Sequence, residues 1–154
     1  MSESIGSCFT VTYEGFAVEL ASPVDVAPGS NGHDPIPELS VKAKAIWDTG
    51  AMVTAITPAV AKRLNLKTVS ITEIATPSGT KECSQYLVDI LLPNMVRANS
   101  ITVVEAIPSS CDVLIGLDII RAGDFAVSNY DGRTSFSFRV PSMQCFDFTK
   151  HSYQ

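Results

Sequence analysis

The most informative stretch of this 154-residue chain is Ala45-Ile46-Trp47-Asp48-Thr49-Gly50-Ala51, in which apolar residues run straight into an acid, a small hydroxyl residue and a glycine. Residues 39–47 alternate with period two, which is typical of a strand. Asp48 therefore lies where a strand ends. A carboxylate at the end of a buried strand is costly unless it is paired or functional, so Asp48 is a candidate catalytic residue.

A second motif stands downstream, where the apolar run Val113-Leu114-Ile115 is stopped by Gly116. Residues 117–121 then predict one or two helical turns that end at Gly123. Asp118 comes at the start of this helix. Carboxylates at a helix N-terminus usually stabilise the helix, so we predict a structural role for Asp118.

Period-two alternation continues through most of the chain and predicts a mainly β fold. Strands are expected at residues 9–13, 16–20, 39–47, 52–56, 69–76, 82–92, 101–106, 113–115, 125–128 and 135–140. Pro77-Ser78-Gly79 and Asp131-Gly132 supply turn residues for two hairpins. Thr57-Pro58 combines an N-cap with a proline at the first helical position, which predicts a second short helix.

The length favours one domain, residues 1–154, with a core at about residues 39–140 and a C-terminal tail at 141–154. Residues 21–38 carry four prolines and two glycines. This composition resists both helix and strand pairing, so an exposed loop is expected there.

Composition and charge disfavour several classes of protein. The formal charge is −5 and the basic residues are scattered, which argues against nucleic-acid binding. The N-terminus shows no signal-peptide pattern, and no apolar run is long enough to cross a membrane. A cytoplasmic protein without membrane association is therefore expected.

Cysteines and histidines suggest neither a metal site nor a cofactor. Cys8, Cys83, Cys111 and Cys145 form no C-x-x-C pair, and buried free thiols are expected. The two histidines, at positions 33 and 151, are expected on the surface and cannot build a His-based catalytic site. Nucleotide-binding and G-x-S-x-G hydrolase motifs are absent from the sequence.

In the order of these features, the chain resembles the retropepsin-like (retroviral-type) aspartic peptidases. It would be a cellular or bacterial member of that family. The resemblance covers residues 39–140 and is most specific at residues 48–51 and 115–120. It implies one half of an acid protease: a closed, barrel-like β fold with a flap hairpin and one or two short helices, assembled as a symmetric homodimer. Peptides or proteins would be its substrates.

The resemblance also assigns roles to individual residues. Asp48 would be the catalytic carboxylate, in an active-site loop with Thr49, Gly50 and Ala51. Thr49 would join the two loops across the two-fold axis. Ile115, Gly116 and Asp118 would form the structural motif, with Gly116 packed under the catalytic loop. The substrate-binding residues would be Met52, Val53, Ile74, Ala75, Thr76, Pro77, Ser78, Gly79 and Leu114, where residues 74–81 form the flap.

The chemistry of peptide hydrolysis explains why two copies of the chain would be needed. Peptide hydrolysis without a metal or covalent intermediate needs a base that activates water and an acid that protonates the scissile group, and two carboxylates sharing one proton supply both. The sequence holds one Asp-Thr-Gly loop, so a second copy must supply the other carboxylate.

The sequence departs from the viral pattern at two positions and leaves other functions open. Viral members often pair an acid and a base where this chain has Met52 and Leu117. Losing both charges together avoids leaving one buried charge unpaired. A catalytically silent dimer that binds a peptide or partner protein, and a latent peptidase blocked by its own terminus, are the alternatives.

Overall fold

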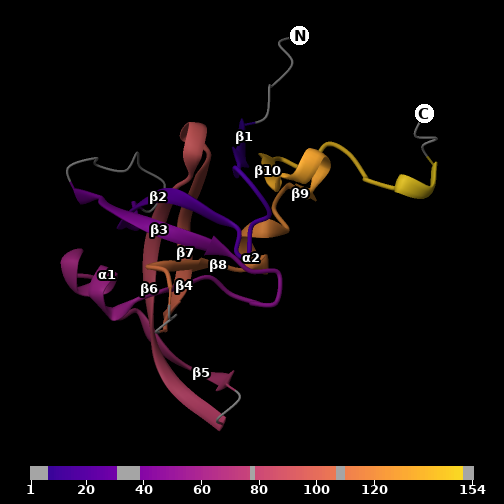
Figure 1. The fold of residues 1–154 in the computed structure, drawn as a ribbon. Helices are drawn as coiled ribbons and strands as arrows, with labels where there is room; N and C mark the ends of the chain where they lie inside the picture. Colours follow the sequence, from indigo (N-terminus) through magenta and orange to yellow (C-terminus); the bar gives the residue numbers. More distant parts are fainter. Residues whose placement is uncertain (1–6, 31–38, 77–78, 107–109, 151–154) are drawn as a thin grey trace.

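The computed structural model describes residues 7–30, 39–76, 79–106 and 110–150, and it is built mainly of β-strands (Figure 1). In chain order the elements are β1 Ser7–Thr12, β2 Ala21–Pro28, β3 Val41–Trp47, β4 Ala55–Ile56, α1 Pro58–Arg63, β5 Ser70–Thr76, β6 Gly79–Leu91, η2 Pro93–Met95, β7 Arg97–Glu105, β8 Val113–Ile115, α2 Leu117–Ile120, β9 Asp124–Ser128, η3 Tyr130–Gly132, β10 Ser135–Val140 and η4 Phe148–Lys150. The mainly β prediction, with two short α-helices, is confirmed.

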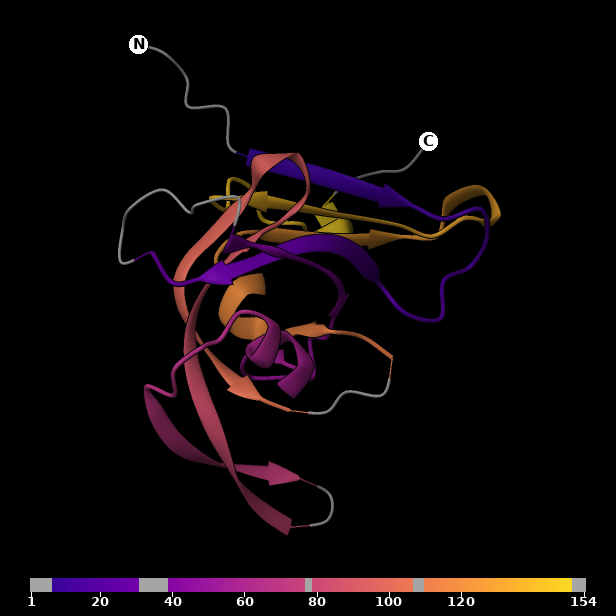
Figure 2. The same ribbon diagram turned by 90° about the vertical axis from the view of Figure 1, so that its left-hand side faces the viewer.

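Seven strands form one sheet in the order β2-β3-β8-β4-β7-β6-β5, and β2 also pairs with β6. This extra pairing closes the sheet into a barrel, as predicted. The strand pairs β3–β8 and β4–β7 are parallel, whereas β4–β8 and the pairs of β2 and β6 with their neighbours are antiparallel. The β5–β6 hairpin projects from the body in both views (Figures 1 and 2).

A second sheet, of order β1-β10-β9, packs on the barrel through aromatic side chains. Trp47 stacks on Phe125 with ring centroids 5.5 Å apart, and Phe9, Phe136 and Phe138 surround the indole. The indole Nε1 donates to Ser22 Oγ at 3.0 Å, so the buried polar atom of Trp47 is satisfied. The strand that leads to Asp48 is therefore fixed in the core by its last residue.

The predicted cap of α1 and the predicted turn at Asp131-Gly132 are found. Thr57 Oγ1 accepts the amide of Val60 at 3.3 Å and caps α1, whose buried face includes Val60 and Ala61. Asp131 and Gly132 both have positive φ, at 53° and 72°, which suits the turn between β9 and β10.

The expected loop at residues 21–38 is wrong for residues 21–28, which form β2. Val24, Val26 and Ala27 are buried, and β2 pairs with β3 through Val26 and with β6 from residue 25 onward. Pro23 therefore has a neighbouring strand on one side only, and Pro28 likewise. A proline without an N–H is tolerated at such one-sided positions. Residues 31–38 lie outside the described residues.

Three further expectations need correction. Residues 16–20 form a loop rather than a strand, because side-chain contacts hold them: Thr134 Oγ1 accepts the amide of Ala17, and the Glu19 carboxylate accepts Lys44 Nζ. Only Ala55–Ile56 of residues 52–56 form a strand, because the amide of Thr54 bonds Asp118 Oδ2 instead of a neighbouring strand. The cysteines are free as predicted, but only Cys83 is buried; Cys8 and Cys145 are exposed.

The half-buried thiol of Cys111 is held in its protonated form, because burial raises its pKa. No helix among the described residues is long and apolar enough to cross a membrane. Both histidines lie outside the described residues.

Candidate active site

Asp48 follows the last residue of β3 and is held by the backbone of its own loop and of β8. Its amide donates to the carbonyl of Ile115 at 2.9 Å. The amide of Gly50 donates to Asp48 Oδ1 at 2.8 Å, and the amide of Ala51 donates to the Asp48 carbonyl at 3.2 Å. Oδ2 makes no hydrogen bond within the described part of the chain. One carboxylate oxygen is therefore fixed by its own loop, while the other has no partner among the described residues.

The parallel pairing of β3 with β8 explains why the two sequence motifs meet. Trp47 lies opposite Ile115 in the register, so the residues that follow, Asp48 and Gly116, leave their strands side by side. A Cβ on Gly116 would lie 2.6 Å from the carbonyl carbon of Val53, so only glycine fits beneath the loop. The amide of Leu117 donates to the Ala51 carbonyl at 2.8 Å and closes the contact.

A buried threonine, which the sequence reasoning missed, locks these segments together. Thr54 has no exposed surface, and its Oγ1 donates to Asp118 Oδ1 at 2.7 Å while accepting the amide of Gly116 at 3.1 Å. The Thr54 amide donates to Asp118 Oδ2 at 2.9 Å. Asp118, in the first turn of α2, also accepts the amide of Ile119 at 3.0 Å. A hydroxyl in an otherwise apolar stretch was the available signal.

The predicted flap residues lie on the β5–β6 hairpin. Ile74 is half-buried opposite Lys81, Ala75 is exposed, and Thr76 pairs with Gly79, whose φ is 120°. Pro77 and Ser78 lie outside the described residues. The hydrogen bonds between residues 48–54 and residues 115–118 do not involve this hairpin. Its role in closing over substrate therefore stays a prediction.

The surface around Asp48 is apolar and open in the single chain. Thr49 and Gly50 are exposed, and the residues Met52, Val53 and Leu117 are 81%, 42% and 36% exposed. Leu114 is half-buried on β8 between β3 and β4. No cluster of three metal-ligating side chains occurs among the described residues.

Comparison with known sequences identifies the family. The sequence model of the family described as "gag-polyprotein putative aspartyl protease" matches residues 40–122, more than half of the chain. The chain therefore belongs to this family of aspartyl proteases. A search of the curated proteins finds no match.

Two solved structures share the fold. A retropepsin-like aspartic protease from Rickettsia conorii is 12% identical, with a TM-score of 0.56 over 91% of this chain and 99% of that one. The EIAV protease complexed with the inhibitor HBY-793 is 21% identical, with a TM-score of 0.53 over 71% of this chain and 91% of that one. The predicted retropepsin-like fold is thereby confirmed.

Proposed function

We propose that this chain is an aspartic endopeptidase that is active as a homodimer. The two Asp48 carboxylates, one from each copy, would activate the water that hydrolyses the peptide bond of a substrate held between them. One observation carries the proposal: the Asp-Thr-Gly loop holds Asp48 Oδ1 with the Gly50 amide at 2.8 Å and leaves Oδ2 without a described partner. Family membership and fold support it.

The reaction needs the two carboxylates in different protonation states. The ionised Asp48 of one copy takes a proton from water, which attacks the scissile carbonyl carbon. The protonated Asp48 of the other copy gives its proton to the carbonyl oxygen, so a tetrahedral diol forms. The C–N bond then breaks as the first Asp48 passes the proton from water to the leaving nitrogen and a hydroxyl of the diol returns a proton to the second Asp48, so the pair again shares one proton. The exposed hydroxyl of Thr49 is free of described partners and would bond across the two-fold axis.

Substrate preference would follow from apolar side chains near Asp48. Met52, Val53, Leu114 and Ile74 are the proposed subsite residues, together with the remaining flap residues named above. Burying a large apolar side chain contributes about 1.5–3 kcal/mol, which favours apolar residues beside the scissile bond without excluding others.

The test is cleavage of a proteome-derived peptide library by the parent and by Asp48→Asn, from acidic to neutral pH. The variant removes the acid and base at constant side-chain size, so we expect cleavage to vanish while the fold is kept. Asp131→Asn is the matched control, because Asp131 is exposed in a turn at φ 53°, where asparagine is well tolerated. Undiminished cleavage by Asp48→Asn would contradict the proposal.

Dimer dependence is tested with the same proteins. Specific activity of the parent should fall on dilution as the dimer dissociates, and sedimentation should give the same midpoint. Excess Asp48→Asn subunits should suppress the parent, because a mixed dimer holds one intact carboxylate. A dimer that binds peptides from the library but cleaves none at any pH would instead favour the catalytically silent alternative.

A further inference from the structure

The strand β8 leads to Gly116, which packs beneath the loop that carries Asp48, yet few strand pairings hold β8 in place. It pairs with β3 at Ala45–Trp47 and with β4 at Ala55 and Ile56. A slip of one residue would turn every side chain of β8 to the other face of the sheet and would move Gly116 away from Asp48. Contacts at the ends of this short strand therefore matter for its register.

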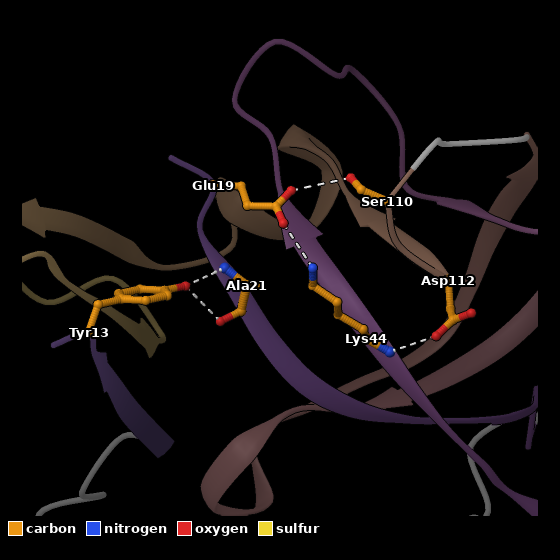
Figure 3. Close-up of polar contacts among 6 residues, drawn as sticks. All are labelled: Tyr13, Glu19, Ala21, Lys44, Ser110 and Asp112. Carbon is orange, nitrogen blue, oxygen red and sulfur yellow. Dashed lines mark hydrogen bonds and ion pairs between the residues drawn. The ribbon is translucent and has the colours of Figure 1, made fainter. Parts of the chain in front are cut away.

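The start of β8 is held by Asp112, a half-buried residue directly before the strand. The Asp112 amide donates to the Lys44 carbonyl at 2.9 Å, and Asp112 Oδ2 accepts the Lys44 amide at 2.9 Å (Figure 3). One residue thus binds both polar backbone groups of Lys44. The Asp112 carbonyl also accepts the amide of Thr57, the N-cap of α1, at 3.0 Å. Asp112 therefore joins β3 to the segment between β4 and α1.

The strand on the other side of β3 cannot replace Asp112. Lys44 lies opposite Pro23 of β2, and proline has no N–H to donate. The exchange of two hydrogen bonds that antiparallel neighbours can make is therefore impossible between these residues. Both polar groups of Lys44 bind Asp112 instead. The bond from the Lys44 amide to the carboxylate is charge-assisted, which makes it stronger than a bond between two neutral backbone groups.

The side chain of Lys44 adds a second link to the same segment. Lys44 Nζ donates to Glu19 Oε1 at 2.8 Å, and Glu19 Oε2 accepts Ser110 Oγ at 3.2 Å (Figure 3). The Lys44 and Glu19 side chains are 48% and 36% exposed, and ion pairs in contact with solvent contribute little. The hydrogen bonds of Asp112 should therefore decide how β3 lies against β8.

The register set at Asp112 continues to the loop that carries Asp48. Asp48 follows Lys44 by four residues, and Gly116 follows Asp112 by four residues. At this far end the Asp48 amide donates to the Ile115 carbonyl at 2.9 Å. The bonds of Asp112 and of the Asp48 amide are thus the two ends of one ladder. A shift at the first end would change where Asp48 lies relative to Gly116.

We infer that Asp112 is a positioning residue: its carboxylate sets the register of β3 on β8 and so holds Asp48 beside Gly116. The consequence for peptide cleavage rests on the proposed function. Two carboxylates that share one proton must lie close together, so a displacement of Asp48 in each copy would disturb the pair. A displacement of about 1 Å can lower the rate of a catalysed reaction on the order of a hundredfold.

The experiment compares Asp112→Ala, which removes the acceptor, with Asp112→Asn, which keeps an oxygen at the same place. Amide hydrogen exchange measured by NMR reports on the hydrogen bond from Asp48 to Ile115 without requiring activity. We expect the Asp48 amide to exchange about tenfold faster in the alanine variant, while the amides of β10, in the other sheet, keep their rates. The asparagine variant should stay within about threefold of the parent.

Two further variants complete the comparison. Glu14→Ala is the matched control, because it removes an exposed carboxylate from the loop between β1 and β2. Asp112→Glu replaces the alanine variant if that variant does not fold. It keeps the charge but moves the carboxylate by one methylene group, so the Asp48 amide should again exchange faster than in the parent.

Peptide cleavage by the same variants gives the second measurement. In Asp112→Ala, kcat should fall about tenfold while KM changes little, because the displaced group acts in the reaction rather than in peptide binding. The pH profile of kcat/KM should also shift, because its apparent pKa values belong to the pair of carboxylates. A loss of stability alone would lower the amount of active protein and leave the pH profile unchanged.

The outcomes separate this inference from the proposed function. Faster exchange confined to the residues around Asp48, with a lower kcat and recovery in Asp112→Asn, supports the inference. Unchanged exchange of the Asp48 amide overturns it, and so does equal acceleration of all amides. An unchanged kcat and pH profile in an active enzyme also overturns it. A parent that cleaves nothing, but whose Asp48 amide still depends on Asp112, contradicts the proposed function alone.

Discussion

Replacing Thr54 with valine should destabilise the chain strongly, although the two side chains have nearly the same shape. The change removes the donor to Asp118 Oδ1 at 2.7 Å and the acceptor of the Gly116 amide at 3.1 Å. Thr54 has no exposed surface, so water cannot replace the lost partner. The Gly116 amide would be left buried without an acceptor.

The magnitude follows from the two losses. A hydrogen bond to a carboxylate contributes about 2 kcal/mol, and an unsatisfied buried N–H costs about 2 kcal/mol. The added methyl group of valine offsets about 1 kcal/mol through apolar burial. The expected net loss is about 3 kcal/mol. With an m-value of about 2 kcal/mol/M, the urea midpoint should fall by about 1.5 M.

Fluorescence of Trp47 is a suitable signal, because this one tryptophan of the sequence stacks on Phe125 in the core. Unfolding should be compared at equal protein concentration, since dimerisation would raise the apparent stability. Thr54→Ser keeps the hydroxyl and should lose only about 1 kcal/mol. A valine variant as stable as the parent, or a serine variant as unstable as valine, would refute the reasoning.

Two further predictions concern other parts of the structure. Gly116→Ala should reduce both peptide cleavage and the urea midpoint, because its Cβ would lie 2.6 Å from the Val53 carbonyl carbon; unchanged values for both would contradict the packing. The amide of Met143, then Ser142 and Arg139, hold the pKa of Asp124 well below its usual range. A carboxyl with a lowered folded-state pKa contributes stability that is present above its ordinary value near 4 and lost as pH falls further. Below about pH 4, the free energy of unfolding measured by chemical denaturation should therefore depend less on pH for Asp124→Asn than for the parent.

Local patterns were sufficient to predict most of the barrel. The strand that leads to Asp48, the capped helix α1 and the two hairpins each depend on residues within a few positions of one another. Thr57 before Pro58 and Asp131 before Gly132 fix backbone conformations through their own side chains. Such elements can be recognised without knowing what they pack against.

The errors concern residues whose structure depends on distant partners. Prolines made residues 21–28 resemble a loop, but β2 has one-sided positions for Pro23 and Pro28 that only the strand order reveals. Phe16 and Val18 alternate as in a strand, yet Thr134 and Glu19 hold that backbone as a loop. The burial of Asp89 was likewise not predicted, because its carboxylate accepts the amide of Ser30, 59 residues away in the sequence, as well as that of Ser100.

One part of the candidate site has all its contacts within a single chain, whereas another part has groups without a partner in the described residues. The contacts of Thr54, Gly116 and Asp118 lie within one chain and set the shape of the loop that carries Asp48. By contrast, Asp48 Oδ2 and the Thr49 hydroxyl have no partner in the described part of the chain. Substitutions in the first group should therefore change stability and activity together. Substitutions at Asp48 should change activity while the fold is kept, which gives the two groups distinguishable signatures in the same assays.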